Sequence, residues 1–136
     1  MVLREATDLT EASRMFAEMY SYPGYTLTEA DAHRRLTIMQ AGPWRVTQAR
    51  LDEKIVGFAL WTDLIEYIFL RSFAIDRAAR TGGLGKQFLA GLRQDIWPAG
   101  RQVRIEVADG GPRGFWEKLG FKAITTGMWL YDEAPA

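Results

Sequence analysis

The sequence predicts an α/β fold in which one mixed, mostly antiparallel sheet is flanked by helices. Two observations favour it. Segments with the alternating polarity of strands are interleaved with segments of helical periodicity, and a glycine-rich turn joins the most apolar strand to an amphipathic helix. A length of 136 residues with 48% hydrophobic residues is typical of one domain with one substantial core. We therefore expect residues 1–136 to form a single domain.

The composition excludes several classes of protein. The chain has 17 basic and 17 acidic residues, so no net field attracts nucleic acid or an anionic membrane. It has no cysteine and one histidine, His33, which removes disulfides, thiolate nucleophiles and recognisable metal sites. No apolar run approaches the roughly 20 residues that span a membrane. We expect a cytoplasmic protein that binds no metal, nucleic acid or membrane.

The N-terminal segment predicts a strand and two helices. A short strand is expected at 2–5. The helix after it should be capped by Asp8, with Glu11 three residues on as its capping-box partner. A second helix should begin at Thr28, with Asp31 in the equivalent position, and end at a Gly-Pro pair.

The remaining segments predict a hairpin, a buried strand and two further helix–strand pairs. Two strand-like runs are joined by a short polar turn, so they should pair antiparallel. The next run is apolar, is broken only by Arg71 and Ser72, and indicates a largely buried central strand. The predicted order is β-α-α-β-β-β-α-β-α-β, and the elements after the second helix lie at 44–51, 55–62, 67–75, 84–96, 103–107, 113–119 and 127–131.

The most informative segment is the turn at 80–86, Arg-Thr-Gly-Gly-Leu-Gly-Lys, between the central strand and the following helix. A helix N-terminus presents unpaired N–H groups and a partial positive charge, and glycine lets that backbone approach a phosphate. Arg80 and Lys86 add charged side chains. Glycines also suit a plain tight turn, so the motif alone is compatible with either interpretation.

Spacing excludes two nucleotide-binding motifs. A P-loop requires glycine at position 80 and serine or threonine at position 87, where the chain has Arg80 and Gln87. A dinucleotide fingerprint that starts at Gly83 requires glycine or alanine at position 88, which is Phe88. The turn is therefore neither a Walker motif nor a Rossmann motif.

The pattern Arg-x-x-Gly-x-Gly, formed by Arg80, Gly83 and Gly85, resembles the pyrophosphate loop of the GNAT N-acetyltransferase superfamily. Residues 70–76 are similar to the fourth strand of that family, and residues 114–121 to its Phe-Tyr-x-x-x-Gly-Phe helix. The early order of elements is also that of the family, so the resemblance covers nearly the whole chain. It implies a GNAT fold and an enzyme that uses an acyl-coenzyme A.

The resemblance also implies how acetyl-CoA, the expected acyl donor, is bound. The pantetheine arm would pair like an added strand with the fourth strand. The pyrophosphate would rest on N–H groups of the glycine turn, as the argument from the helix N-terminus independently predicts. The donor-binding residues predicted in this way are Phe73, Ala74, Ile75, Arg80, Thr81, Gly82, Gly83, Leu84, Gly85, Lys86, Asp109 and Trp116.

Acyl transfer to an amine requires a group that takes up the proton of the amine. A lysine-like amine has a pKa of about 10.4, so at neutral pH a base or a chain of water must remove that proton. Glu66, just before the fourth strand, is the first candidate for the base. Glu106 and Asp109 are the alternatives.

The general acid departs from the family pattern. Trp116 stands where the family commonly carries a tyrosine acid, and the indole N–H cannot serve as an acid. Tyr131 or Tyr67 could replace it. A coenzyme A thiol, with a pKa of roughly 8.5, can also leave as a thiolate without an acid.

The sequence thus predicts an acyl-CoA-dependent N-acyltransferase that transfers acetyl from acetyl-CoA to an amine by direct attack on the thioester. The alternative is a non-catalytic acyl-CoA-binding sensor or dimerisation module on the same fold, which the tryptophan at position 116 keeps open. The expected partner is a small-molecule or peptide amine, and a homodimer is compatible with the fold. Four aromatic residues suit either acceptor binding or packing at the acceptor cleft: Tyr20, Tyr22, Tyr25 and Trp44.

Overall fold

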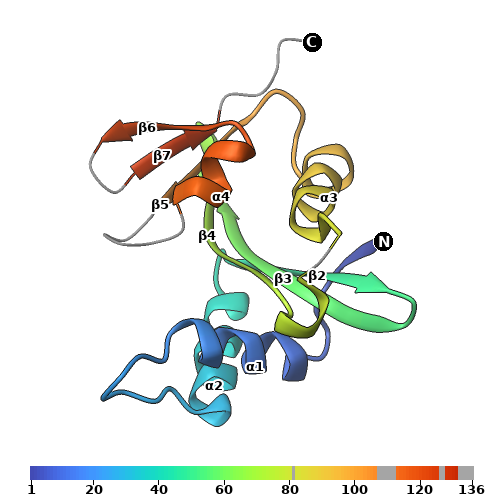
Figure 1. Ribbon diagram of the computed structural model, residues 1–136, viewed down its shortest axis with the longest axis vertical. Coiled ribbons are helices and arrows are strands. Elements are labelled where there is room, and N and C mark those ends of the chain that lie inside the picture. The colour runs from blue at the N-terminus through green and yellow to red at the C-terminus, as the bar shows by residue number, and fades with distance from the viewer. Residues whose placement is uncertain (81, 107–112, 126–127, 132–136) are drawn as a thin grey trace.

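A seven-stranded sheet in the order β1-β2-β3-β4-β5-β7-β6 forms the centre of the molecule (Figure 1). The computed structural model describes residues 1–80, 82–106, 113–125 and 128–131. Neighbouring strands are antiparallel, except that β4 and β5 are parallel. The strands are β1 (Val2–Glu5), β2 (Arg45–Leu51), β3 (Lys54–Asp63), β4 (Tyr67–Ile75), β5 (Gln102–Glu106), β6 (Phe121–Thr125) and β7 (Met128–Tyr131).

Helices cover both faces of the sheet. Figure 1 shows α1 and α2 together on one side of the strands and α3 and α4 on the other. None of the helices in the described ranges is long and apolar enough to cross a membrane. The helical segments are α1 (Thr10–Met19), α2 (Glu29–Ala41), the 3₁₀ turn η1 (Arg77–Ala79), α3 (Leu84–Gly91), the π-helical turn η2 (Leu92–Ile96) and α4 (Arg113–Lys118).

Each face of the sheet has its own apolar core. Phe58 of β3 is fully buried in the core that α1 and α2 cover. Ile68 of β4 and Phe88 of α3 are fully buried in the core on the other face. Because β3 and β4 are buried on both faces, they form the rigid centre of the sheet.

The predicted α/β fold class is confirmed, and the structure adds one strand to the predicted order. That strand is β6, which begins at Phe121 directly after α4 and pairs antiparallel with β7. The hairpin of β2 and β3 is antiparallel, as predicted. The β6 sequence Phe-Lys-Ala-Ile-Thr shows no clear alternation of polarity, and β6 is defined by its pairing with β7.

The start of α1 differs from the predicted capping box. The Asp8 carboxylate accepts hydrogen bonds from the Thr10 hydroxyl at 2.6 Å and the Thr10 N–H at 2.9 Å, which lower its pKa. Glu11 instead forms an ion pair with Arg14 at 2.7 Å. Thr28 caps α2 as predicted, because its hydroxyl accepts the N–H three residues on at 3.1 Å.

Candidate functional site

The parallel strands β4 and β5 separate after three residue pairs. Pairing runs from Tyr67 with Gln102 to Phe69 with Arg104, and no further pair joins these two described strands. Beyond this level β4 continues to Ile75. The edge of β4 that faces away from β3 therefore stays open among the described residues.

The open edge presents the backbone of Phe73 and Ile75. The N–H of Asp76 donates to the carbonyl of Val56 on the β3 side at 2.7 Å. In an antiparallel ladder alternate residues direct their backbone groups to the same neighbour, so those of Ala74 also face β3. The groups of Phe73 and Ile75 face the opposite way, where an extended ligand can pair with them.

The glycine turn lies at the end of this edge. Gly82 and Gly83 have φ angles of 82° and 74°, in the left-handed region that glycine adopts without strain. A Cβ atom on either would meet nothing within 4 Å, so the turn faces open space. The Arg80 Nε atom donates to the Ile75 carbonyl at 3.1 Å, which joins the turn to the end of β4. Thr81 lies outside the described residues.

The first turn of α3 supplies N–H groups and packs against α4. Gly83 is the N-cap of α3, so the N–H groups of Leu84, Gly85 and Lys86 have no partner within the helix. A Cβ atom on Gly85 would lie 3.1 Å from the ring of Phe115. This glycine therefore permits the close approach of α3 and α4, while the N–H groups and the open turn can receive an anion.

Trp116 is a core residue behind the open edge. Its side chain is 8% exposed. Its ring centroid lies 5.0 Å from that of Phe115, 5.1 Å from that of Phe121 and 5.5 Å from that of Phe73. This packing supports Phe73 at the edge of β4. Asp109, the other donor-binding candidate near α4, lies outside the described residues.

A β-bulge in β4 takes Arg71 out of the strand ladder. Leu60 of β3 pairs with Ser72, whereas the next residue, Trp61, pairs with Leu70. Arg71 is therefore the extra residue, without a partner on β3. The Arg71 side chain contacts α2 and Trp44, and the Ser72 side chain contacts the residue that follows α1. The bulge therefore directs both side chains to the face of the sheet that α1 and α2 cover.

A cavity of about 370 Å³ opens where β4 and β5 separate. The Arg71 guanidinium lies 5.4 Å from the ring centroid of Trp44, and the ring of Phe69 lies 5.9 Å from that of Trp44. The Tyr20 hydroxyl forms a hydrogen bond with the buried Ser72 hydroxyl at 2.7 Å. The residues that line the cavity are Tyr20, Trp44, Phe69, Arg71 and Glu106.

The two charged residues of this cavity have no ion-pair partner among the described residues. Arg71 donates only to the thioether sulfur of Met39, at 3.6 Å, and all ion pairs of the described residues involve other side chains. Glu106 lies at the end of β5. By the parallel register of β4 and β5 it is level with Arg71, two residues beyond the last pair. A cation and an anion thus face one cavity unneutralised.

Three of the catalytic candidates from the sequence lie toward the other end of β4: Glu66, Tyr67 and Tyr131. Glu66 is exposed and lies in the turn just before β4. The ring of Tyr67 lies 4.1 Å from the Arg104 guanidinium, at the level where β4 and β5 are paired. Neither Glu66 nor Tyr67 lines the cavity. The backbone of Tyr131 pairs with Val103, also toward the paired end, and its side chain is outside the described residues.

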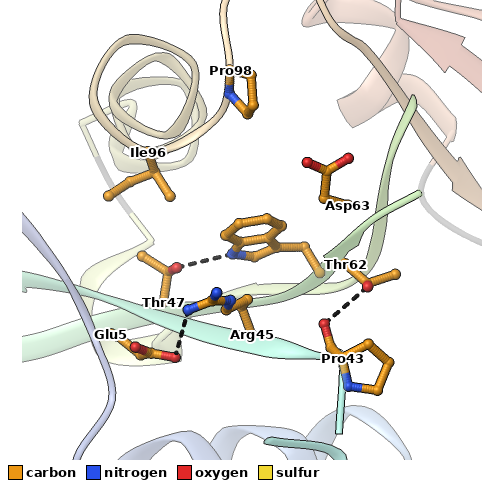
Figure 2. A pocket seen from close by; sticks show the side chains of 9 residues that line it. Glu5, Pro43, Arg45, Thr47, Thr62, Asp63, Ile96 and Pro98 are labelled. Carbon is orange, nitrogen blue, oxygen red and sulfur yellow. Dashed lines mark hydrogen bonds and ion pairs between the residues drawn. The ribbon is translucent and has the colours of Figure 1, made fainter. Parts of the chain in front are cut away.

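A second cavity, of about 550 Å³, lies on the opposite face of the sheet, and its charges are neutralised locally. Figure 2 shows its lining residues, with the ion pair between Arg45 and Glu5 as a dashed line. Arg45 forms an ion pair with Glu5 at 3.5 Å, and Asp63 forms one with Arg101. The indole N–H of its tryptophan donates to Thr47 at 2.9 Å. These groups satisfy one another, so we do not place the site there. The lining residues are Glu5, Pro43, Arg45, Thr47, Trp61, Thr62, Asp63, Ile96 and Pro98.

Comparison with solved structures identifies the fold. No family model and no curated protein matches the sequence. An acetyltransferase from Thermus thermophilus is 16% identical, with a TM-score of 0.75 and 98% of both chains covered. The ribosomal-protein-S18-alanine N-acetyltransferase from Escherichia coli is 16% identical, with a TM-score of 0.72 over 99% of this chain and 95% of that one. A protein from Desulfovibrio desulfuricans assigned to the GNAT family of acetyltransferases is 21% identical, with a TM-score of 0.67 over 98% and 99%.

The chain has the GNAT fold. The GNAT fold that the sequence resemblance implies is thereby confirmed. In this GNAT fold the open edge of β4 begins at the level of the cavity between β4 and β5 and ends in the glycine turn. In the described part of the chain, no three histidine, aspartate or glutamate side chains gather as a metal site requires.

Asp76 connects this region of the GNAT fold to α1. Its carboxylate accepts hydrogen bonds from Arg14 at 2.8 Å and from the N–H of Ala78 at 3.3 Å. Burial raises the pKa of Asp76, but these hydrogen bonds and the charges of Arg14 and Lys54 outweigh it, so the pKa lies below its usual value of 3.8. The ionised carboxylate therefore stabilises the end of β4, from which the glycine turn follows.

The Asp76→Asn variant should lose stability in a pH-dependent way. A carboxylate with a lowered pKa contributes stability that is present above its unfolded pKa, near 3.8, and lost as pH falls through its folded pKa. We expect the variant to lose about 1–2 kcal/mol at pH 7 and the difference from wild type to shrink below about pH 4. Urea unfolding between pH 3 and 7 measures this. Asp52→Asn, in an exposed turn with φ of 49°, is the control, and a difference independent of pH would contradict the assignment.

Proposed function

We propose that the protein is an acyl-CoA-dependent N-acyltransferase that transfers acetyl from acetyl-CoA to an amine. The observation that carries the proposal is the open edge of β4, which begins at the level of a cavity and ends in a glycine turn and a helix N-terminus. A strand-like arm that ends in a pyrophosphate has the shape and charge to fit this arrangement. The names of similar structures support it, because they include acetyltransferases and an N-acetyltransferase.

The acyl donor would be bound mainly by the backbone. Phe73 offers its outward N–H and carbonyl groups to the amides of the pantetheine arm, and Ile75 offers its outward N–H, since the Ile75 carbonyl already accepts a hydrogen bond from Arg80. Gly82 and Gly83 leave open space in front of the first turn of α3, where N–H groups can bind the pyrophosphate. Arg80 lies beside the same turn and adds positive charge. Ala74 would contribute its small side chain rather than its backbone.

The reaction requires the amine to lose a proton as it attacks the thioester carbonyl carbon. A C–N bond forms, the C–S bond breaks, and coenzyme A leaves as a thiolate that takes up a proton. Glu106, at the level where β4 and β5 have separated, is placed to accept the proton of the amine. Because a thioester is already reactive, holding the amine against it supplies much of the acceleration.

A hydroxyl in the cavity can return the proton to the leaving thiolate. Tyr20 lines the cavity, and its hydroxyl is hydrogen bonded to Ser72 at 2.7 Å. A phenol can both donate and accept a proton. Tyr20 is therefore the proposed general acid, a role that the indole of the buried Trp116 cannot fill.

The direct test is to add acetyl-CoA to the purified protein and follow first the melting temperature and then the release of thiol with a panel of amines. We expect a rise of several degrees, because a ligand that binds the native state stabilises it, followed by release of thiol. ATP, which carries adenine and phosphates without the pantetheine arm, is the control. A rise without thiol release would favour a non-catalytic acyl-CoA sensor, and no rise would make the proposal wrong.

A further inference from the structure

We propose that the acceptor is an amino carboxylate, a small molecule whose reacting amine lies a few bonds from a carboxylate. The inference rests on the proposed acyl transfer and identifies the substrate class of the same site. It is carried by the opposite charges of Arg71 and Glu106, which face one cavity with aromatic walls and are unpaired in the described part of the chain.

The two charges are arranged to meet a zwitterion. Arg71 comes from β4 and Glu106 from β5, at the first level where these strands no longer pair. By contrast, the cavity on the opposite face neutralises its own charges through Arg45 with Glu5 and Asp63 with an arginine. A ligand that brings one carboxylate and one ammonium group would neutralise both walls of the first cavity at once.

The structure holds the Arg71 guanidinium at the cavity wall. The bulge removes Arg71 from the ladder, so its side chain is not committed to either core. The guanidinium lies 5.4 Å from the ring centroid of Trp44 and contacts the sulfur of Met39 at 3.6 Å. With both contacts in place the guanidinium can still bind a carboxylate, to which it can donate two parallel hydrogen bonds.

The position of the carboxylate determines where the amine lies. With the carboxylate at Arg71, the amine a few bonds away is directed across the cavity to Glu106, which accepts its proton as the C–N bond forms. Trp44 and Phe69, whose rings lie 5.9 Å apart, form an apolar wall for the rest of the molecule. A cavity of about 370 Å³ suits a small ligand. Arg71 would repel a polyamine, which has no anion to offer.

The test compares amines that differ only in the carboxylate. The rate of thiol release from acetyl-CoA is measured with L-phenylalanine against L-phenylalaninamide, with L-leucine against L-leucinamide, and with spermidine. The ratio of kcat/KM for each acid to that for its amide is compared between variants, which cancels the intrinsic reactivity of each amine. Arg71→Met should lower this ratio by about 10- to 30-fold, and Arg71→Lys should lower it less. Arg45→Met, the same change at an exposed arginine on the opposite face, should leave the ratio unchanged.

Each outcome separates this inference from the proposed function. An unchanged ratio in Arg71→Met, or a preference of the wild type for spermidine, would overturn the inference while acyl transfer stands. The inference would also be overturned if other amines released thiol but no amino acid and no amino acid amide of the panel did. If acetyl-CoA does not raise the melting temperature of the wild type, the proposed function is wrong and the inference falls with it. The melting temperature of Arg71→Met with and without acetyl-CoA shows whether the variant remains folded.

Discussion

Replacing Gly83 with tryptophan should weaken the binding of acetyl-CoA by roughly 100-fold or more, because the indole would occupy the open space before the α3 N-terminus. At a ligand concentration 100 times the dissociation constant, wild-type protein should gain about 2.7 kcal/mol of stability, and the variant should gain almost none. The measurement is the melting temperature as a function of acetyl-CoA concentration. Turnover at subsaturating acetyl-CoA should fall in parallel.

Gly100→Trp is the matched control for this substitution. Gly100 has a φ of 77°, close to the 74° of Gly83, and a Cβ atom there would also meet nothing within 4 Å. Both variants therefore carry a similar backbone strain of about 1 kcal/mol. Gly100 precedes β5 at the paired end of the sheet, far along β4 from the glycine turn. Loss of the acetyl-CoA response in both variants, or in neither, would contradict binding at the turn.

Replacing Glu106 with glutamine should lower kcat by about 100-fold, because the amide cannot accept the proton of the attacking amine. The affinity for acetyl-CoA should change little, since Glu106 lies on β5 and is not among the groups of β4 and the glycine turn proposed to bind the donor. The rate of the variant should recover as pH rises toward the pKa of the amine, about 10 for a lysine-like amine, where the free base is already present. Steady-state rates from about pH 6 to 10 measure both effects.

Glu66→Gln is the companion variant, since Glu66 is the base that the sequence predicts first. Its exposed position before β4 and its absence from the cavity lining lead us to expect a kcat within about twofold of wild type. If Glu66→Gln lost activity and Glu106→Gln kept it, the expectation from sequence would be right and the proposed base wrong. A uniform loss in both variants, with lower melting temperatures, would point to folding instead of proton transfer.

Much of the fold could be predicted because its signals are local. The helical stripes, the cap at Thr28 and the hairpin turn between β2 and β3 each depend on a few neighbouring residues. The strand β6 was not predicted, because its residues show no clear alternation of polarity and it is defined by its pairing with β7. The separation of β4 from β5 could not be predicted either, since it depends on where two distant segments stop pairing.

The candidate site was predictable in part. The glycine turn is a contiguous motif, and the structure gives Gly82 and Gly83 the left-handed backbone and open space that an anion site requires. The cavity between the strands joins residues from separate segments of the chain, so spacing along the sequence could not reveal it. One signal was available: the adjacent polar residues Arg71 and Ser72 interrupt an apolar strand at the position of the bulge. Glu106 could be weighed only as an alternative without the register of β5.

The bulge in β4 has an evolutionary consequence. In the proposed scheme the donor is recognised by main-chain atoms of Phe73 and Ile75, which almost any residue would supply, whereas the acceptor is recognised by the side chain at position 71. That position has no partner on β3 and belongs to neither core. Natural selection can therefore change position 71 to suit a new acceptor at little cost in stability, while the chemistry that uses the common donor is inherited unchanged.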